Sequence, residues 1–260
     1  MTTLRQFLGG LTCALCGWML TACSSEEDSL EIPEGKGLVR IGLSADTGFS
    51  TQTKAVTESD YENLENYTVQ IWKDGSVFSG MSWNYQDMPA FTELKNGTYT
   101  LLAFNGDSTK AVYTNDLCFL GSTNFTLDND TANVTVNCKP NSARINVVFD
   151  EKMDTYFSSY TVNISTLAQN GSVYPWTKDT QGPVYFKVGE NEAVKVKISL
   201  TKTDGTNANV QEKEYTLSPA DALKITVAPV VNSGNVGITI DIDETVIDHP
   251  VDIEIPSEWV

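Results

Sequence analysis

The chain of 260 residues carries 34 acidic against 17 basic residues, which gives a formal net charge of -17 at pH 7. Such a charge repels phosphate backbones and anionic lipid headgroups, so nucleic acid is excluded as a partner. With 40% hydrophobic residues, this length predicts a folded body of one large or two modest domains.

Residues 1–22 are typical of a lipoprotein signal peptide. One cation, Arg5, precedes an apolar segment from Phe7 to Leu20, which is too short and wrongly flanked for a spanning helix. The segment closes with Leu20-Thr21-Ala22-Cys23, so we expect cleavage between Ala22 and Cys23. Acyl chains on Cys23 would then anchor the protein in membrane lipid, because each buried methylene contributes about 0.8 kcal/mol. The alternative is an ordinary secretory signal in which this cysteine occurs by chance.

Residues 23–36 predict a flexible acidic tether between the anchor and the folded body. Ser24-Ser25-Glu26-Glu27-Asp28 is polar and acidic, and Pro33 and Gly35 precede any strand pattern. We expect this composition to hold the body off the membrane.

Period-two alternation of apolar and polar residues recurs from Gly37 almost to the end, which predicts an all-β fold. The expected strands include 39–43, 67–71, 99–101, 134–136, 144–149, 160–164, 194–198, 238–242 and 251–255. Four dipeptides supply the positive φ angles of tight hairpins, namely Asp74-Gly75, Asn96-Gly97, Asn170-Gly171 and Asp204-Gly205. We therefore expect most neighbouring strands to pair antiparallel.

The pattern breaks at Lys139-Pro140-Asn141-Ser142, near the middle of the mature chain. About a hundred residues on each side is a common size for one β-sandwich. The sequence therefore predicts two tandem antiparallel β-sandwich domains, 37–139 and 140–260. The alternative is one continuous sandwich in which this stretch is a long turn.

Two cysteines, Cys118 and Cys138, remain after the signal peptide and its lipidated cysteine. In the oxidising cell envelope, a disulfide between them would close a loop of about 20 residues and contribute about 3 kcal/mol. Two buried free thiols are the other interpretation, because a sequence does not show whether the two Cβ atoms approach each other.

Four aromatic residues are the candidates for stacking on sugar rings: Trp72, Trp83, Tyr85 and Trp176. Packing in the core is the competing explanation for each of them. Trp83 and Tyr85 lie in a loop-like stretch, which raises their chance of exposure.

No catalytic or cofactor motif is present, so we expect neither an enzyme nor a cofactor. The single histidine, His249, leaves too few ligands for a Cys/His zinc site. Asp128-Asn129-Asp130 lacks the glycine and distal glutamate of a calcium loop and predicts a polar turn. Asp241 and Asp243 share one face of an expected strand, which indicates either a cation site or a solvated surface. We predict no metal site.

Several strand patterns together resemble a surface lipoprotein family of Bacteroidota that is defined only by a domain of unknown function and is related to fimbrillins. The patterns are Gly37-Leu38-Val39-Arg40-Ile41, Thr53-Lys54-Ala55, Tyr67-Thr68-Val69-Gln70-Ile71, Gly97-Thr98-Tyr99-Thr100-Leu101, Val134-Thr135-Val136-Asn137-Cys138 and Val251-Asp252-Ile253-Glu254-Ile255. The resemblance implies two β-sandwiches of transthyretin-like build and an outer-membrane location facing the cell exterior. The acidic string after Cys23 resembles the surface-export signal of such proteins.

The resemblance leaves two function classes open. The first is a structural or adhesive surface protein that associates with other fimbrillin-like subunits, with maturation by cleavage at Lys54. Relatives tend to have arginine at this position, so the lysine departs from their pattern. The second is a glycan-binding lipoprotein that takes host or dietary glycans for a polysaccharide-uptake system. A cluster of coplanar exposed aromatic rings would favour the glycan-binding class. A removable edge strand would favour the structural or adhesive class.

Overall fold

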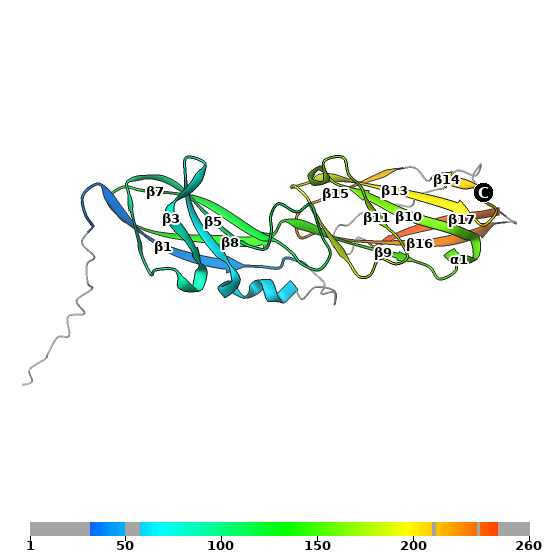
Figure 1. Cartoon of the computed structure of the whole chain (residues 1–260), viewed down its shortest axis with the longest axis horizontal. Coiled ribbons are helices and arrows are strands. Elements are labelled where there is room, and N and C mark those ends of the chain that lie inside the picture. The colour runs from blue at the N-terminus through cyan, green and yellow to red at the C-terminus, as the bar shows by residue number, and fades with distance from the viewer. Residues whose placement is uncertain (1–31, 50–57, 210–211, 233–234, 244–260) are drawn as a thin grey trace, which may run out of the picture. The chain divides into compact units, whose positions relative to one another are not determined.

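The computed structural model describes residues 32–49, 58–209, 212–232 and 235–243, and most of its regular structure is β-strand (Figure 1). The strands are β1 (Lys36–Ala45), β2 (Thr68–Lys73), β3 (Ser76–Asn84), β4 (Thr92–Lys95), β5 (Gly97–Asn105), β6 (Val112–Tyr113), β7 (Phe119–Leu127), β8 (Thr131–Pro140), β9 (Ser142–Phe149), β10 (Phe157–Ser165), β11 (Tyr174–Trp176), β12 (Val184–Lys187), β13 (Glu192–Lys202), β14 (Asn207–Asn209), β15 (Lys213–Leu217), β16 (Ala222–Asn232) and β17 (Asn235–Asp243). The helical segments are short: η1 (Glu58–Glu62), η2 (Leu64–Asn66), η3 (Tyr85–Asp87), α1 (Met153–Tyr156) and η4 (Leu167–Gln169). Among these described helices, none has the length and apolar character that a membrane span requires.

The strands follow the alternation of the sequence, because side chains on a strand point to opposite faces in turn. In β1, Val39, Ile41 and Leu43 are buried, and β13 buries every second residue from Glu192 to Leu200. The predicted all-β class is confirmed. The expected strand at 251–255 lies outside the described residues.

The first sheet has seven strands in the order β3-β2-β5-β7-β8-β1-β4. Strands β7 and β8 pair only at Phe119 with Pro140 and at Leu120 with Lys139. Because they pair at one end only, β8, β1 and β4 form a layer that faces β2, β5 and β7 across one core. This core holds Ile41, Leu101 and other buried side chains of both layers.

Two five-stranded sheets enclose a second core. One has the order β11-β10-β13-β14, with β15 also on β13, and the other has the order β17-β16-β9-β12-β6. Val162 on β10 and Val194 on β13 share this core with Ile145 on β9 and Ile225 on β16. The two sheets therefore pack face to face as a β-sandwich.

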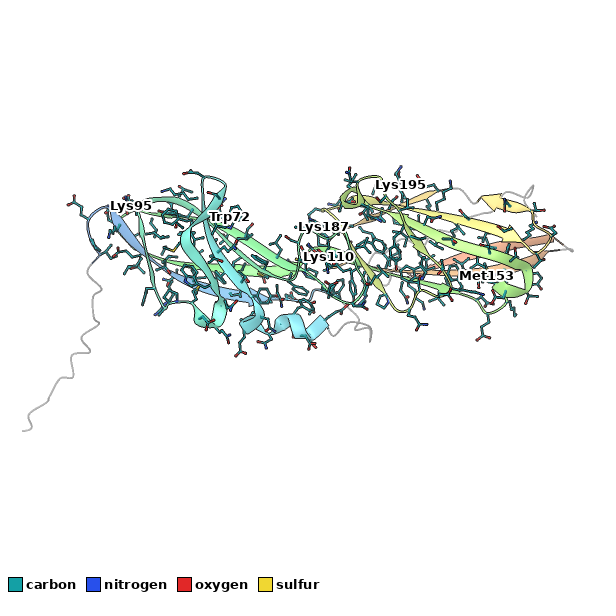
Figure 2. All side chains as sticks on the ribbon, in the orientation of Figure 1. Trp72, Lys95, Lys110, Met153, Lys187 and Lys195 are labelled. Atoms are coloured by element: carbon teal, nitrogen blue, oxygen red, sulfur yellow. The ribbon has the colours of Figure 1, made fainter. Side chains whose placement is uncertain are left out.

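Strands and side chains connect the two cores across the predicted domain boundary. Strand β6 pairs with β12, where Val112 lies opposite Phe186, and Tyr185 of β12 is buried in the first core. The side chain of Lys187 donates to the backbone oxygen of Ser108 at 2.7 Å, beside the segment that carries Lys110 (Figure 2). The described residues belong to one compact unit that begins at Ile32. Two domains divided at residues 139 and 140 remain a prediction.

Most strand pairs are antiparallel, but two are parallel: β1 with β8 and β9 with β16.

Of the predicted hairpin turns, Asp74-Gly75 joins β2 to β3 and Asp204-Gly205 joins β13 to β14. Asn170-Gly171, with φ angles of 49° and 86°, lies between β10 and β11. The prediction for Asn96-Gly97 is wrong, because β4 and β5, which it connects, pair with other strands. The backbone N–H of Asn96 instead donates to Gly35 O at 3.0 Å.

Candidate functional site

The predicted lipidation and maturation residues Ala22, Cys23 and Lys54 lie outside the residues that the structure describes. The segment that carries Lys54 has buried residues on both sides of it. Phe49 precedes the segment with 8% of its surface exposed, and Glu58 follows it with 4% exposed.

Cys118 and Cys138 are buried free thiols, which is the alternative to the predicted disulfide. The thiol of Cys118 contacts Phe119 O at 3.9 Å, and that of Cys138 donates to Ala103 O at 3.4 Å. The register that places Leu120 opposite Lys139 puts Cys138 across from Gly121, three positions along the strand from Cys118. This offset is about 10 Å, whereas a disulfide requires Cα atoms within about 7 Å. The expectation of a bridge is therefore corrected.

Burial keeps both thiols protonated. It raises the pKa of the Cys118 thiol to about 11 and that of the Cys138 thiol to about 12. Because the thiolate is the reactive form of cysteine, neither side chain is suited to act as a nucleophile or a redox group at neutral pH.

The four candidate aromatics do not form one cluster. Trp176 is 1% exposed in the second core. Trp83 and Tyr85 are half-buried and pack against the first core. Trp72, which is also half-buried, lines an open groove whose lining does not include Trp83 or Tyr85. The sequence could not show this, because an irregular register between β2 and β3 places Trp83 opposite the buried Val69.

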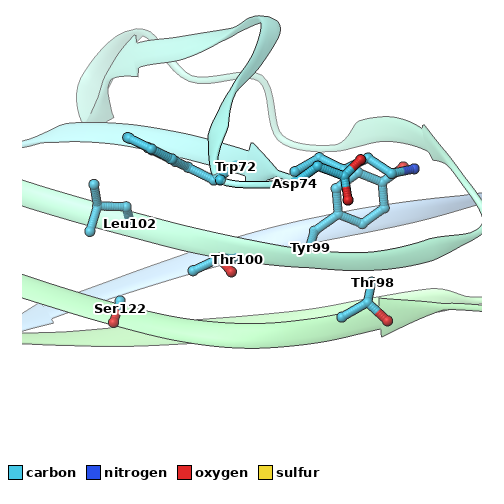
Figure 3. Close-up of a pocket in the computed structure, with 9 residues that line it drawn as sticks. Trp72, Asp74, Thr98, Tyr99, Thr100, Leu102 and Ser122 are labelled. Carbon is cyan, nitrogen blue, oxygen red and sulfur yellow. The ribbon is translucent and has the colours of Figure 1, made fainter.

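The groove beside Trp72 has a volume of about 510 Å³ and lies over β2, β5 and β7 (Figure 3). Its lining is Trp72, Lys73, Asp74, Gly75, Thr98, Tyr99, Thr100, Leu102 and Ser122. Trp72 Nε1 donates to Gln70 Oε1 at 3.0 Å, and the hydroxyl of Thr100 donates to Asn124 Oδ1 at 2.8 Å. One aromatic ring therefore stands next to several polar side chains.

A second depression of about 500 Å³ lies beside the second sandwich and includes Trp176 in its lining. The hydroxyl of Tyr160 donates to Asp154 Oδ1 at 3.0 Å, and Lys178 Nζ lies 3.3 Å from the same oxygen. Burial and the neighbouring Asp154 raise the pKa of Tyr160 to about 12. These polar groups bond one another, and the Trp176 ring is too deeply buried to stack on a ligand.

Sequence reasoning missed a buried charged cluster near the segment that carries Lys54. Arg144 Nη1 donates to Glu58 Oε1 at 2.9 Å, and the hydroxyl of Tyr185 donates to the same oxygen at 2.8 Å. The Arg144 guanidinium also lies 5.0 Å from the centre of the Phe49 ring. An arginine inside the apolar strand β9 was the available signal, but its partner lies 86 positions away.

The acidic residues that suggested cations have other roles where the structure describes them. Asp128-Asn129-Asp130 forms the predicted turn, in which Asp130 Oδ1 accepts from the backbone of Asp128 at 3.2 Å. Asp241 and Asp243 lie on β17, but their side chains are outside the described set. Within the described ranges, no group of three or more His, Cys, Asp or Glu is arranged to hold a metal ion.

Several solved structures are similar to this chain at low sequence identity. A candidate adhesin from Bacteroides ovatus is 12% identical, with a TM-score of 0.46, over 89% of this chain and 98% of that one. A candidate cell adhesion protein from Bacteroides eggerthii is 11% identical, with a TM-score of 0.44, over 82% and 97%. A fimbrial assembly protein from Parabacteroides distasonis is 14% identical, with a TM-score of 0.38, over 84% and 97%.

None of the curated proteins matches this chain. The model of the family DUF4493, a domain of unknown function, matches residues 35–257. That match spans most of the 260 residues and confirms the resemblance seen in the strand patterns. The chain therefore belongs to the DUF4493 family.

Proposed function

We propose that this protein is a surface-exposed outer-membrane lipoprotein of fimbrillin-like type with a structural or adhesive role. The observation that carries the proposal is the length of chain between the predicted lipidation site, Cys23, and the first strand, β1. The backbone N–H of Gly35 already donates to Asn129 Oδ1 of the body at 2.8 Å, so residues 23–34 would span at most about 40 Å when fully extended. The whole chain has a net charge of -17, so the folded body at the end of this tether would be repelled by anionic headgroups. Both features support display away from the membrane.

The adhesive part of the proposal is tested on whole cells that carry the full-length protein, the Cys23→Ala variant or no copy of the gene. We expect cells with the anchored protein to aggregate or to adhere to coated surfaces more than the other two. Equal adhesion of all three cell types would contradict the role.

The structural part concerns β1, which lies between β8 and β4 in the first sheet. If cleavage near Lys54 released β1, both neighbours would lose a partner, and a strand from a second molecule could replace it. Against release, β1 pairs with β8 from Leu38 to Ala45, and Phe49 contacts Arg144. Limited proteolysis followed by native mass measurement tests this. Cleavage that leaves the protein monomeric at high concentration would exclude polymerisation by this route.

The alternative is a glycan-binding lipoprotein that serves polysaccharide uptake. An extended platform of coplanar aromatic rings would favour it, but Trp176 is buried, and Trp83 packs against the first core. Trp72 lines its groove without Trp83, Tyr85 or Trp176 beside it. The described aromatic residues therefore favour the adhesive class.

A further inference from the structure

The groove beside Trp72 lies on the outer face of β2, β5 and β7. Trp72 is opposite Thr100, which is opposite Asn124, so these three side chains point to the same face. The next row on that face contains Leu102 and Ser122. The alternate residues of the same strands form the core, so this outer face does not belong to the packing of the sandwich.

The indole of Trp72 is held in place on this surface. Its Nε1 donates to Gln70 Oε1 at 3.0 Å, which satisfies the one polar atom of the ring. Figure 3 shows the ring extending toward Leu102 and away from Asp74. A ring that is already ordered loses little conformational entropy when a ligand packs against it. The half-buried Trp72 and Leu102 therefore form an apolar platform of fixed geometry.

Polar groups stand beside this platform in the lining of the groove. The Thr100 hydroxyl donates to Asn124 Oδ1 at 2.8 Å, so its oxygen still offers acceptor capacity. The side chains of Ser122 and Asp74 are exposed, and they add a hydroxyl and a carboxylate to the lining. An aromatic face combined with a few hydroxyl and carboxylate groups matches a pyranose, which has an apolar face and a polar edge.

Charge selects among the possible sugars. Asp74 contributes a negative charge to the lining of the groove, and the whole chain has a net charge of -17. The one cation of the lining, Lys73, has its Nζ 4.8 Å from the centre of the Tyr99 ring. The lining therefore carries one charge of each sign, and the net negative charge of the whole chain disfavours an anionic sugar.

We propose that this groove binds one neutral pyranose unit of a glycan. The unit stacks on Trp72, and its hydroxyls bond to Thr100 and Ser122. The volume of about 510 Å³ is within the range of small-molecule sites. The inference deepens the proposed adhesive role by naming the chemical class of the surface that is bound, and it depends on that role for its biological setting.

Affinity electrophoresis of the full-length protein in detergent tests the inference. Native gels contain one polysaccharide each: the neutral mannan, xylan, galactan or β-glucan, or the anionic polygalacturonate or chondroitin sulfate. We expect at least one neutral polymer to retard the wild type. Trp72→Ala should raise the dissociation constant about tenfold or more, because it removes the stacking surface.

Two threonine variants form a matched pair. Thr100→Val removes a hydroxyl inside the groove, and Thr126→Val removes one from the same sheet face outside the lining. Binding should weaken in Thr100→Val and persist in Thr126→Val, while circular dichroism and thermal melts show that all variants remain folded. Retardation by no neutral polymer, retardation by anionic polymers alone, or unchanged retardation of Trp72→Ala would overturn the inference. Because the assay uses purified protein, its result does not depend on where the cell places the chain.

Discussion

Arg144 connects side chains that come from distant parts of the chain. It is 4% exposed, and it reaches Glu58, which is equally buried, at 2.9 Å. Tyr185 donates to the same carboxylate at 2.8 Å. A buried charge is costly unless a partner of opposite charge compensates it, so the pair holds η1 against β9. This contact explains why the fold tolerates an arginine inside a strand that is otherwise largely apolar.

Removing the negative charge of this pair should destabilise the protein strongly. We expect Glu58→Gln to lower the free energy of unfolding by about 3 kcal/mol, because the buried Arg144 loses its counter-charge. The control is Glu93→Gln, which removes the exposed ion pair with Lys36 and should cost at most about 1 kcal/mol. Urea titration measures both variants. If both variants lose the same small amount of unfolding free energy, the buried pair does not stabilise the fold.

The two cysteines should react only after unfolding, since both are buried free thiols. We expect iodoacetamide without reductant to leave the folded protein unmodified at Cys118 and Cys138. In denaturant both should be alkylated, which intact mass measurement detects. A mass that shows no alkylation in denaturant, but alkylation after reduction, would demonstrate the disulfide instead.

The same thiols predict a loss of stability at alkaline pH. The ordinary pKa of 9.0 rises to about 11 for Cys118 and to about 12 for Cys138, so the folded state retains these protons to a higher pH. Their contribution is complete below about pH 9 and is lost as the pH rises through the folded-state values. The urea midpoint should therefore fall between pH 9 and pH 12. The midpoint should fall less in the Cys118→Ala, Cys138→Ala double variant. If the midpoint falls with pH equally steeply in the wild type and in this variant, the explanation is contradicted.

At the scale of the elements, alternation predicted strands such as β1 and β13, because apolar residues occupy every second position of their sequences and are buried there. It could not predict which strands pair. Alternation identifies the buried face of a strand but not its neighbour, so the parallel pairing of β1 with β8 was not foreseen. The groove was missed for a related reason, since Trp72 meets Thr100 and Asn124 only through the order of three strands.

Gly121 shows how closely β7 and β8 approach each other. A Cβ atom at this position would lie 2.4 Å from Asn137 O, closer than such atoms can approach. We expect Gly121→Ala to lower the free energy of unfolding by about 1–3 kcal/mol, because the strands must separate. The neighbouring exposed Ser122→Ala should change it by less than about 0.5 kcal/mol. If chemical denaturation finds both variants equally stable, the close approach is not present in solution.

At the scale of the whole molecule, a β-fold begins at Lys36, behind the predicted lipoprotein signal and acidic tether. Length and composition predicted a folded body, alternation predicted its all-β class, and the strand patterns predicted the family that the match over residues 35–257 confirms. The same features did not predict that the two cores share residues, because Tyr185 enters the first core from a strand that is distant in sequence. The proposed anchoring and surface display would connect this body to its proposed role.

The most direct test of this account is the location of the protein in cells, with and without Cys23. Outer-membrane fractions and protease treatment of intact cells should show the wild type in the membrane and accessible from outside. Cys23→Ala should leave the membrane fraction, because the acyl chains that would hold the protein in lipid cannot be attached. A Cys23→Ala protein that stays in the membrane, or a wild type that protease cannot reach on intact cells, would contradict the proposal that the protein is a surface-displayed lipoprotein.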